Sequence, residues 1–381
     1  MTKLPQWADI VLVPLISLVL AAIVSALVLL SIGQSPVEAI SIMVDGAFGS
    51  ANGWGYTLYY ATSFMFTGLA VTVAFHAGLF NIGGEGQAQL GGLGVALICL
   101  ALPWPHWTLA LLAASLGGAA FGAAWAAIPA YLQAKRGSHI VITTIMFNYI
   151  GAAFIIYMLV DVLRPPGQQD PATAKFPTGT HLPALSDIPM LRELFARWNA
   201  DGTPKLTKAG IQMYSNVPAN VTLFIAIAAC FAVWALLWRT RLGYQIRAFG
   251  KSEAASRYAG INPVKITMIA MLISGGLAGL MAINNVMGAS GRLLQNSAEG
   301  AGFIGIAVAL MGRNHPIGVF LAAILFGFLY QGGAALGLHT TIPLEMRLVV
   351  QGLVILFTGA LDQMVRMLLA WAFSLGKKRI A

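Results

Sequence analysis

Long apolar runs, each about as long as a membrane-spanning helix, constrain the fold of this chain more than any other feature of its sequence. Crossing about 30 Å of hydrocarbon at 1.5 Å per residue takes about 20 residues. Hydrophobic side chains make up 58% of the 381 residues and charged side chains 9%, and the mean hydropathy is +0.78. A water-soluble fold cannot bury that much apolar surface. The sequence therefore predicts an all-α, polytopic membrane protein.

About ten runs are long and apolar enough to be spans when polar residues, Gly or Pro mark their ends. They cover residues 10–32, 55–76, 86–103, 107–133, 139–163, 218–238, 264–288, 298–313, 316–337 and 345–370. The third and eighth are rich in Gly and are the weakest, so eight or nine spans is the alternative. The first is too long for a signal-peptide core. The whole chain, 1–381, is interpreted as one transmembrane domain.

Basic residues beside the ends of these runs predict the orientation, because loops rich in Lys and Arg stay in the cytoplasm. Those expected inside are Lys135, Arg136, Arg239, Arg241, Arg247, Lys251, Arg257, Lys265, Arg313, Lys377, Lys378 and Arg379. Residues 33–54 contain neither Lys nor Arg and are expected to form a short outer loop. The pattern predicts an even number of spans with both termini in the cytoplasm. It also explains the net charge of +9 without nucleic-acid binding.

A polar segment, residues 164–217, separates five expected spans from the other five. We call it the external insert. It is expected to contain a short helix near Met190–Trp198, and it is either a solvated connector or a docking surface for an extracellular binding protein. Asn81, Glu85 and Gly86 before the insert faintly echo Asn296, Glu299 and Gly300 after it. Since many transporters contain two repeats, a five-plus-five repeat is possible.

The basic connector 239–265, between the sixth and seventh expected spans, contains a predicted short helix at Ser252–Tyr258. Ser252 can cap this helix, Glu253 favours its positive end and Gly260 can stop it. A rigid helix across the cytoplasmic face could transmit the movement of a partner protein to the spans. The alternative is a plain basic loop that only anchors the topology.

No ATP site, metal site or catalytic set is predicted. Gly250-Lys251-Ser252 resembles the end of a phosphate-binding loop, but such a loop needs Gly at position 245, where this chain has Gln. His76, His139 and His315 have no metal-ligand spacing. We therefore expect no cofactor and no covalent chemistry, and any ATP that powers transport must bind another polypeptide.

Three stretches carry a resemblance to a known family. They are FHAGLFNIGGEGQAQLGG (75–92), AFGKSEAASRYAGINPVKI (248–266) and GAGFIGIAVALMGRNHPIG (300–318). In this order they resemble bacterial ABC-transporter permeases for branched-chain amino acids, ribose-type sugars and nucleosides, particularly the nucleoside and simple-sugar branch. The resemblance covers about residues 60–365 without the external insert, which is longer than the family pattern leads us to expect.

This resemblance implies an importer in the bacterial inner membrane with two identical or homologous permease subunits, two cytoplasmic ABC ATPase subunits and an external solute-binding protein. The implied solute is a nucleoside or purine-like compound, with ribose-type sugars and branched-chain amino acids as alternatives. The implied ATPase contacts are Gly250, Lys251, Glu253, Ala254, Ala255, Arg257, Gly260 and Ile261.

The glycine-rich stretch NIGGEGQ predicts a helix break, because several Gly residues are poor choices inside a straight helix. A break at membrane depth survives only against protein or a watery cavity, and a carboxylate there is costly unless it is paired. The candidate solute path comprises Asn81, Glu85, Gln87, Phe147, Asn148, Asn284 and Asn285. The alternative for Glu85 is a cytoplasmic turn between two spans, in which its carboxylate is either wet or caps the next helix. The alternative for the amides is helix-to-helix fastening.

Two other classes of membrane protein remain as alternatives. An ion-driven secondary transporter needs ionisable relay groups in its spans, and only Glu85, Asp161, Glu345 and Asp362 come near. An intramembrane enzyme needs a polar catalytic set at one depth, which the sequence does not offer. Small-residue runs at 117–127 and 275–282 predict close helix packing and not a ligand site.

Overall fold

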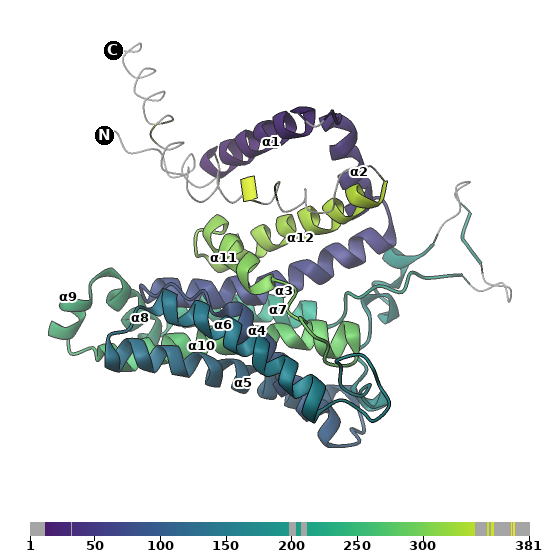
Figure 1. Cartoon of the computed structure of the whole chain (residues 1–381). Coiled ribbons are helices and arrows are strands. Elements are labelled where there is room, and N and C mark those ends of the chain that lie inside the picture. Colours follow the sequence, from purple (N-terminus) through teal and green to yellow (C-terminus); the bar gives the residue numbers. More distant parts are fainter. Residues whose placement is uncertain are drawn as a thin grey trace, which may run out of the picture. The chain divides into compact units, whose positions relative to one another are not determined.

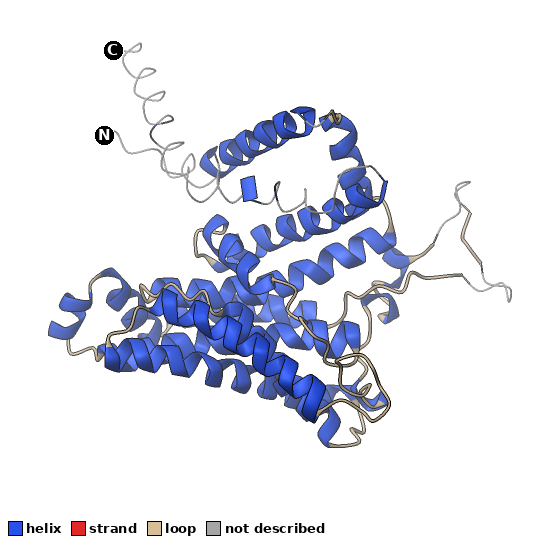
Figure 2. Ribbon diagram, viewed as in Figure 1, coloured by secondary structure: helices blue, strands red, loops and turns tan. Residues whose placement is uncertain are grey.

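The computed structural model describes residues 12–31, 33–197, 203–206 and 212–339, with a few isolated positions beyond them. Helices dominate the described part of the chain (Figures 1 and 2). The α-helices are α1 (Val13–Ser31), α2 (Pro36–Phe48), α3 (Ala51–His76), α4 (Gly84–Ala101), α5 (Trp107–Arg136), α6 (Ile140–Tyr157), α7 (Thr222–Arg239), α8 (Arg241–Lys251), α9 (Glu253–Tyr258), α10 (Pro263–Ala282), α11 (Ala301–Met311) and α12 (Pro316–His339). Two π-helical segments, η2 (Met158–Val162) and η6 (Ile283–Ser290), extend α6 and α10.

Six helical segments in the described part of the chain are long and apolar enough to cross a membrane. They are Ala51–His76, Trp107–Arg136, Ile140–Val162, Thr222–Arg239, Pro263–Ser290 and Pro316–Leu338. The bent pair α1 and α2 could add a seventh. The all-α, polytopic fold is therefore confirmed, while the count of about ten stays a prediction. The last expected span, 345–370, lies almost wholly outside the described residues.

The structure differs from the sequence prediction at several expected elements. The expected span 298–313 contains only α11, whose 11 residues rise about 16 Å and fall short of the hydrocarbon thickness. Its start is cut back because Glu299 and Gly300 have φ values of +50° and +78°, outside the helical region. The outer loop expected at 33–54 contains a helix, α2, and its location outside stays a prediction. Ser35 caps α2, and Pro36 occupies its first turn.

The described residues fall into two compact units, Met1–Gly53 with Phe328–Ala381, and Trp54–Gly327. In the first unit, α2 packs on the end of α12. The rings of Phe48 and Phe328 stack with centroids 5.4 Å apart, and Gln331 Nε2 donates a hydrogen bond to the Gly46 carbonyl at 3.3 Å.

The core of the second unit is built on α10, which packs along α5 and α4. A β-carbon added at Gly122 of α5 would collide with the Gly275 carbonyl, and one added at Gly279 of α10 would collide with the Gly118 carbonyl. Glycine at these positions lets the two backbones touch, which is how helices without a hydrophobic driving force gain packing contacts. The close packing predicted for the small-residue runs is confirmed.

The external insert joins the rest of the second unit through main-chain contacts. Thr173 N–H donates to the Leu293 carbonyl at 3.1 Å, and Leu293 N–H donates to Thr173 Oγ1 at 3.0 Å. In place of the helix expected at Met190–Trp198, a single 3-10 turn covers Arg192–Phe195, and Trp198 lies outside the described residues. Figure 1 shows this insert and the helices α8 and α9 at opposite ends of the unit.

Candidate functional site

The connector after α7 folds into two short helices that cross at the end of the second unit. Thr240 caps α8, since its Oγ1 accepts from Gly243 N–H at 3.0 Å. One face of α8 buries Gly243, Ile246 and Phe249. The sequence analysis did not predict α8, although a threonine cap followed by apolar residues at three-residue intervals was a usable signal.

The predicted short helix is confirmed as α9, with the expected residues at its ends. Ser252 Oγ accepts from Ala255 N–H at 3.2 Å, and Gly260 has a φ of +78°. Arg257 donates to the Glu253 carboxylate at 2.6 Å in an exposed (i, i+4) pair. Tyr258 is 96% exposed. The connector therefore presents a capped helix that another protein can reach.

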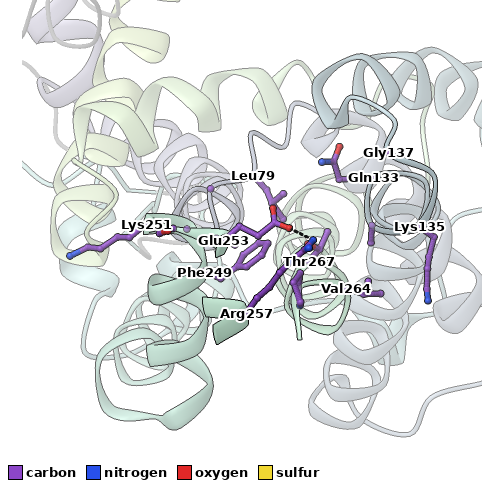
Figure 3. A pocket seen from close by; sticks show the side chains of 16 residues that line it. Leu79, Gln133, Lys135, Gly137, Phe249, Lys251, Glu253, Arg257, Val264 and Thr267 are labelled. Carbon is purple, nitrogen blue, oxygen red and sulfur yellow. Dashed lines mark hydrogen bonds and ion pairs between the residues drawn. The ribbon is translucent and has the colours of Figure 1, made fainter. Parts of the chain in front are cut away.

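A cleft of about 500 Å³ lies beside α9 (Figure 3). Its walls are the turn after α3, the end of α5, the junction of α8 with α9 and the start of α10. In Figure 3 the Glu253–Arg257 pair stands near Phe249 and Thr267, while Lys251 and Lys135 extend outward on opposite sides. Of the predicted ATPase contacts, those that line the cleft are Gly250, Lys251, Glu253 and Arg257. Ala254, Ala255 and Gly260 are exposed, and Ile261 is buried.

A second polar constellation lies at the helix break before α4. Glu85 is only 6% exposed, and its two carboxylate oxygens accept from Gly300 N–H and Gly302 N–H, each at 2.9 Å. These are free donors at the amino end of α11, where a carboxylate is favoured. Gly302 must be glycine-sized, because an added β-carbon would collide with the Glu85 backbone. We call this joint between the starts of α4 and α11 the Glu85 clamp.

The clamp lies deep inside the second unit. Gly305 of α11 packs against Thr67 of α3, nine residues before His76 at the end of that helix. Nine residues of α-helix rise about 13 Å. Gly302, which binds Glu85, lies almost one helical turn before Gly305 and so still further from His76. The carboxylate is therefore about half a bilayer thickness from the α8–α9 end of the unit. Its burial excludes a solvated carboxylate, whereas the alternative of a helix-capping role agrees with its bonds to the start of α11. The depth of this turn in the membrane stays a prediction.

Amide side chains hold the backbone on the approach to the clamp. Asn81 Nδ2 donates to Gln87 Oε1 and to Ser274 Oγ, both at 2.9 Å. Asn148 Nδ2 donates to the Ile82 carbonyl at 2.9 Å, and Asn148 Oδ1 accepts from Gly86 N–H at 2.8 Å. The bonds of Asn148, together with the one that Gly83 N–H donates to Asn81 Oδ1 at 2.9 Å, satisfy backbone groups that the break would otherwise leave unpaired in an apolar interior.

The other predicted amides form a separate cluster within η6. Asn284 Nδ2 donates to the Tyr59 carbonyl at 3.0 Å, and its Oδ1 accepts from Thr222 Oγ1 at 2.9 Å. Asn285 Oδ1 accepts from Ser63 Oγ at 2.7 Å. The structure thus ties η6 to α3 and α7, and Ser63 and Thr222 are partners that the sequence analysis missed. In the sequence, the only signal for these two partners was a hydroxyl side chain inside an apolar helix.

Phe147 borders the break through its backbone, because a β-carbon added at Gly86 would lie 3.1 Å from its carbonyl oxygen. Its ring packs on Trp125 with centroids 5.3 Å apart, and its carbonyl accepts from Trp125 Nε1 at 3.1 Å. The side chains of Asn81, Glu85, Gln87 and Asn148 are therefore gathered at the break, whereas those of Asn284, Asn285 and Phe147 are not. Every predicted amide has partners within the chain, as the fastening alternative expected, and the role of these residues in a solute path stays a prediction.

Residues 53–359 match the family described as the permease component of the branched-chain amino acid transport system. The chain belongs to this permease family. Among its relatives is the guanosine ABC transporter permease protein NupP of Bacillus subtilis (strain 168), 34% identical over 92% of this chain and 93% of the relative.

Two further relatives of this permease cover nearly as much sequence. The nucleoside ABC transporter permease protein NupB of Lactococcus lactis subsp. cremoris (strain MG1363) is 33% identical over 91% of this chain and 90% of its own. The glucose ABC transporter permease protein TsgB13 of Haloferax volcanii is 30% identical over 90% and 86%. The resemblance stated from the three sequence stretches is confirmed at the level of the family and its nucleoside and sugar branch.

Replacing Glu85 should destabilise the permease in a graded way. Glu85→Ala leaves the buried Gly302 N–H and the part-buried Gly300 N–H without this acceptor, at a cost of about 1–3 kcal/mol for the buried group, whereas Glu85→Gln keeps one acceptor oxygen. We expect the order of thermal stability to be parent, Glu85→Gln, Glu85→Ala, measured as the unfolding temperature of the purified protein in detergent. Glu193→Ala, at an exposed carboxylate, is the matched control. Equal unfolding temperatures for Glu85→Ala and the parent would contradict the clamp.

Proposed function

We propose that this permease imports nucleosides or purine-like compounds. The observation that carries the proposal is its similarity, over about nine-tenths of both chains, to relatives named for guanosine and for nucleosides. A glucose permease among the relatives favours a sugar as the second candidate. The family description keeps branched-chain amino acids as the third.

The proposed complex contains two permease subunits, identical or homologous, two cytoplasmic ABC ATPase subunits and an external solute-binding protein. ATP is hydrolysed on the ATPase subunits. We assign α8 and α9 as the surface gripped by an ATPase subunit, because α9 is capped, exposed and bordered by a polar cleft. A capped helix resists deformation, so it can carry a partner's displacement into the spans.

The proposed topology follows from the opposite locations of the connector and the insert. With α8 and α9 in the cytoplasm, the external insert reaches the outside, in agreement with the distribution of Lys and Arg. We propose about ten spans in the bacterial inner membrane, with both termini in the cytoplasm. A five-plus-five arrangement is supported by one correspondence, since Glu85 lies in the first turn of α4 and the echoed Glu299 lies just before α11.

The proposed mechanism is alternating access, in which the solute passes between two permease subunits. The candidate path residues in the described conformation bond to the chain itself. Solute contact with Asn81, Gln87 or Asn148 therefore requires the break to open. Because each broken hydrogen bond in a low-dielectric interior is costly, ATP-driven movement is a suitable source of that opening free energy.

Single-cysteine labelling should report the proposed topology. Tyr258 is 96% exposed on α9 and Met190 is 89% exposed on the insert, while the native Cys99 and Cys230 are buried. In intact cells a membrane-impermeant maleimide should label Met190→Cys and spare Tyr258→Cys until the membrane is permeabilised. The reverse pattern would overturn both the topology and the proposed ATPase contact.

Changes on α9 should uncouple ATP hydrolysis from uptake. Glu253→Lys reverses a charge on the exposed helix, and Gly260→Val forces a β-branched residue into a φ of +78°. Because an exposed ion pair contributes only about 0–1 kcal/mol, Glu253→Lys should insert and fold normally. In vesicles containing the complete complex, we expect ATP hydrolysis to persist while uptake falls. Normal uptake in both variants, or uptake by the permease without companion subunits, would refute the proposed coupling.

The solute class can be ranked by uptake into the same vesicles. Radiolabelled adenosine, uridine, ribose and leucine represent the candidates, and we expect uptake of the two nucleosides to exceed that of the others. The binding protein and the ATPase must be present in every assay, because delivery to the permease is expected to depend on both. Preferential uptake of ribose or leucine would reject the nucleoside proposal while leaving the permease assignment intact.

A further inference from the structure

The end of α8 rests directly on the turn that leaves α3. A β-carbon added at Gly250 would collide with the His76 carbonyl oxygen and would lie 2.8 Å from Gly78 N. From the other side, a β-carbon added at Gly78 would lie 3.3 Å from Gly250 Cα. The two segments thus touch backbone to backbone, and no flexible side chain lies between them. Arg247 reinforces this end of α8, because its guanidinium lies 5.9 Å from the ring of Trp238, which packs on His76.

The chain that follows Gly78 leads to the Glu85 clamp as a braced arm, residues 79–84. Asn81 ties the arm to Ser274 of α10, and Ser274 Oγ in turn donates to the Ala70 carbonyl of α3 at 2.7 Å. Ile82 is held at both its polar groups, because its N–H donates to Thr144 Oγ1 at 3.3 Å and its carbonyl accepts from Asn148. A backbone segment restrained at successive residues transmits a displacement instead of absorbing it.

We propose that the contact between Gly250 and Gly78 is the joint through which movement of α8 and α9 reaches the Glu85 clamp. Gly250 is then a positioning residue for transport, and its smallness sets how closely α8 can follow the turn after α3. The inference rests on the proposed coupling function of α9 and adds the route by which that coupling enters the membrane. It assigns Gly250 a contact inside this chain, in addition to any contact with an ATPase subunit.

Two substitutions test the joint from its two sides, each with a matched control. Gly250→Ala places a methyl group against the end of α3, whereas Gly276→Ala makes the same change in a helix where the nearest atom is 3.5 Å away. Gly78→Ala adds a methyl group against Gly250 at a φ of +71°, whereas Gly33→Ala imposes nearly the same strain at +76° with nothing within 4 Å. Both variants of a pair carry the same general cost of replacing glycine. The difference between them therefore reports the contact at the joint.

The measurement is solute taken up per ATP hydrolysed by the complete complex in vesicles. We expect Gly250→Ala to lower this ratio at least about fivefold, the lower end of typical coupling effects, and Gly78→Ala to lower it less. Both controls should retain the parent ratio. ATPase subunits should still co-purify with Gly250→Ala, so a loss confined to the ratio is not explained by misfolding.

The outcomes distinguish the joint from the coupling proposal on which it rests. A parent-like ratio in Gly250→Ala, with uncoupling in Glu253→Lys, overturns the joint and keeps the ATPase contact. Parent-like ratios in both variants overturn both proposals. If Gly250→Ala fails to assemble, Gly78→Ala and Gly33→Ala decide, and an equal ratio in these two variants also overturns the joint.

Discussion

In hydrocarbon a polypeptide must satisfy its own backbone hydrogen-bonding groups, and this constraint organises the second unit of the permease. Continuous helices meet it without help. The break before α4 does not, so Asn81 and Asn148 bond its backbone and Gln87 holds Asn81. Glu85 does the same for the free N–H groups at the start of α11. The same groups that make a break tolerable also fix its geometry. The proposed opening at this break would therefore start from a buried arrangement whose polar groups are paired.

Close helix packing also supports the break before α4. Glycines in α5 and α10 bring two backbones into contact, and α10 also supplies Ser274 to the arm and, through η6, Asn284 and Asn285 to α3. A single continuous span thus connects the tightly packed seam with both polar clusters. Movement at one cluster has to be accommodated by α10, whose neighbours leave little free volume.

Sequence reasoning succeeded where a local signal determines the structure. Apolar length identified most long spans, and Ser252, Glu253 and Gly260 marked the limits of α9. It failed where the outcome depends on partners distant in the chain. Apolar composition could not show that α11 starts only at Ala301, nor that the N–H groups of Gly300 and Gly302 meet a carboxylate more than two hundred residues earlier. The candidate site was recognisable by residue type, but its division into two clusters required the tertiary contacts.

In the proposed topology, the hydrogen bonds between Thr173 and Leu293 connect the outside of the cell with the Glu85 clamp. Leu293 belongs to the short stretch that joins η6 to α11, and that stretch ends at Gly300, a donor to Glu85. A protein that displaced the insert would displace the stretch from Leu293 to Gly300. Movement of α8 would displace the arm on the other side of the Glu85 carboxylate. Two inputs that arrive from opposite ends of the second unit would then compete or cooperate at a single pair of oxygen atoms.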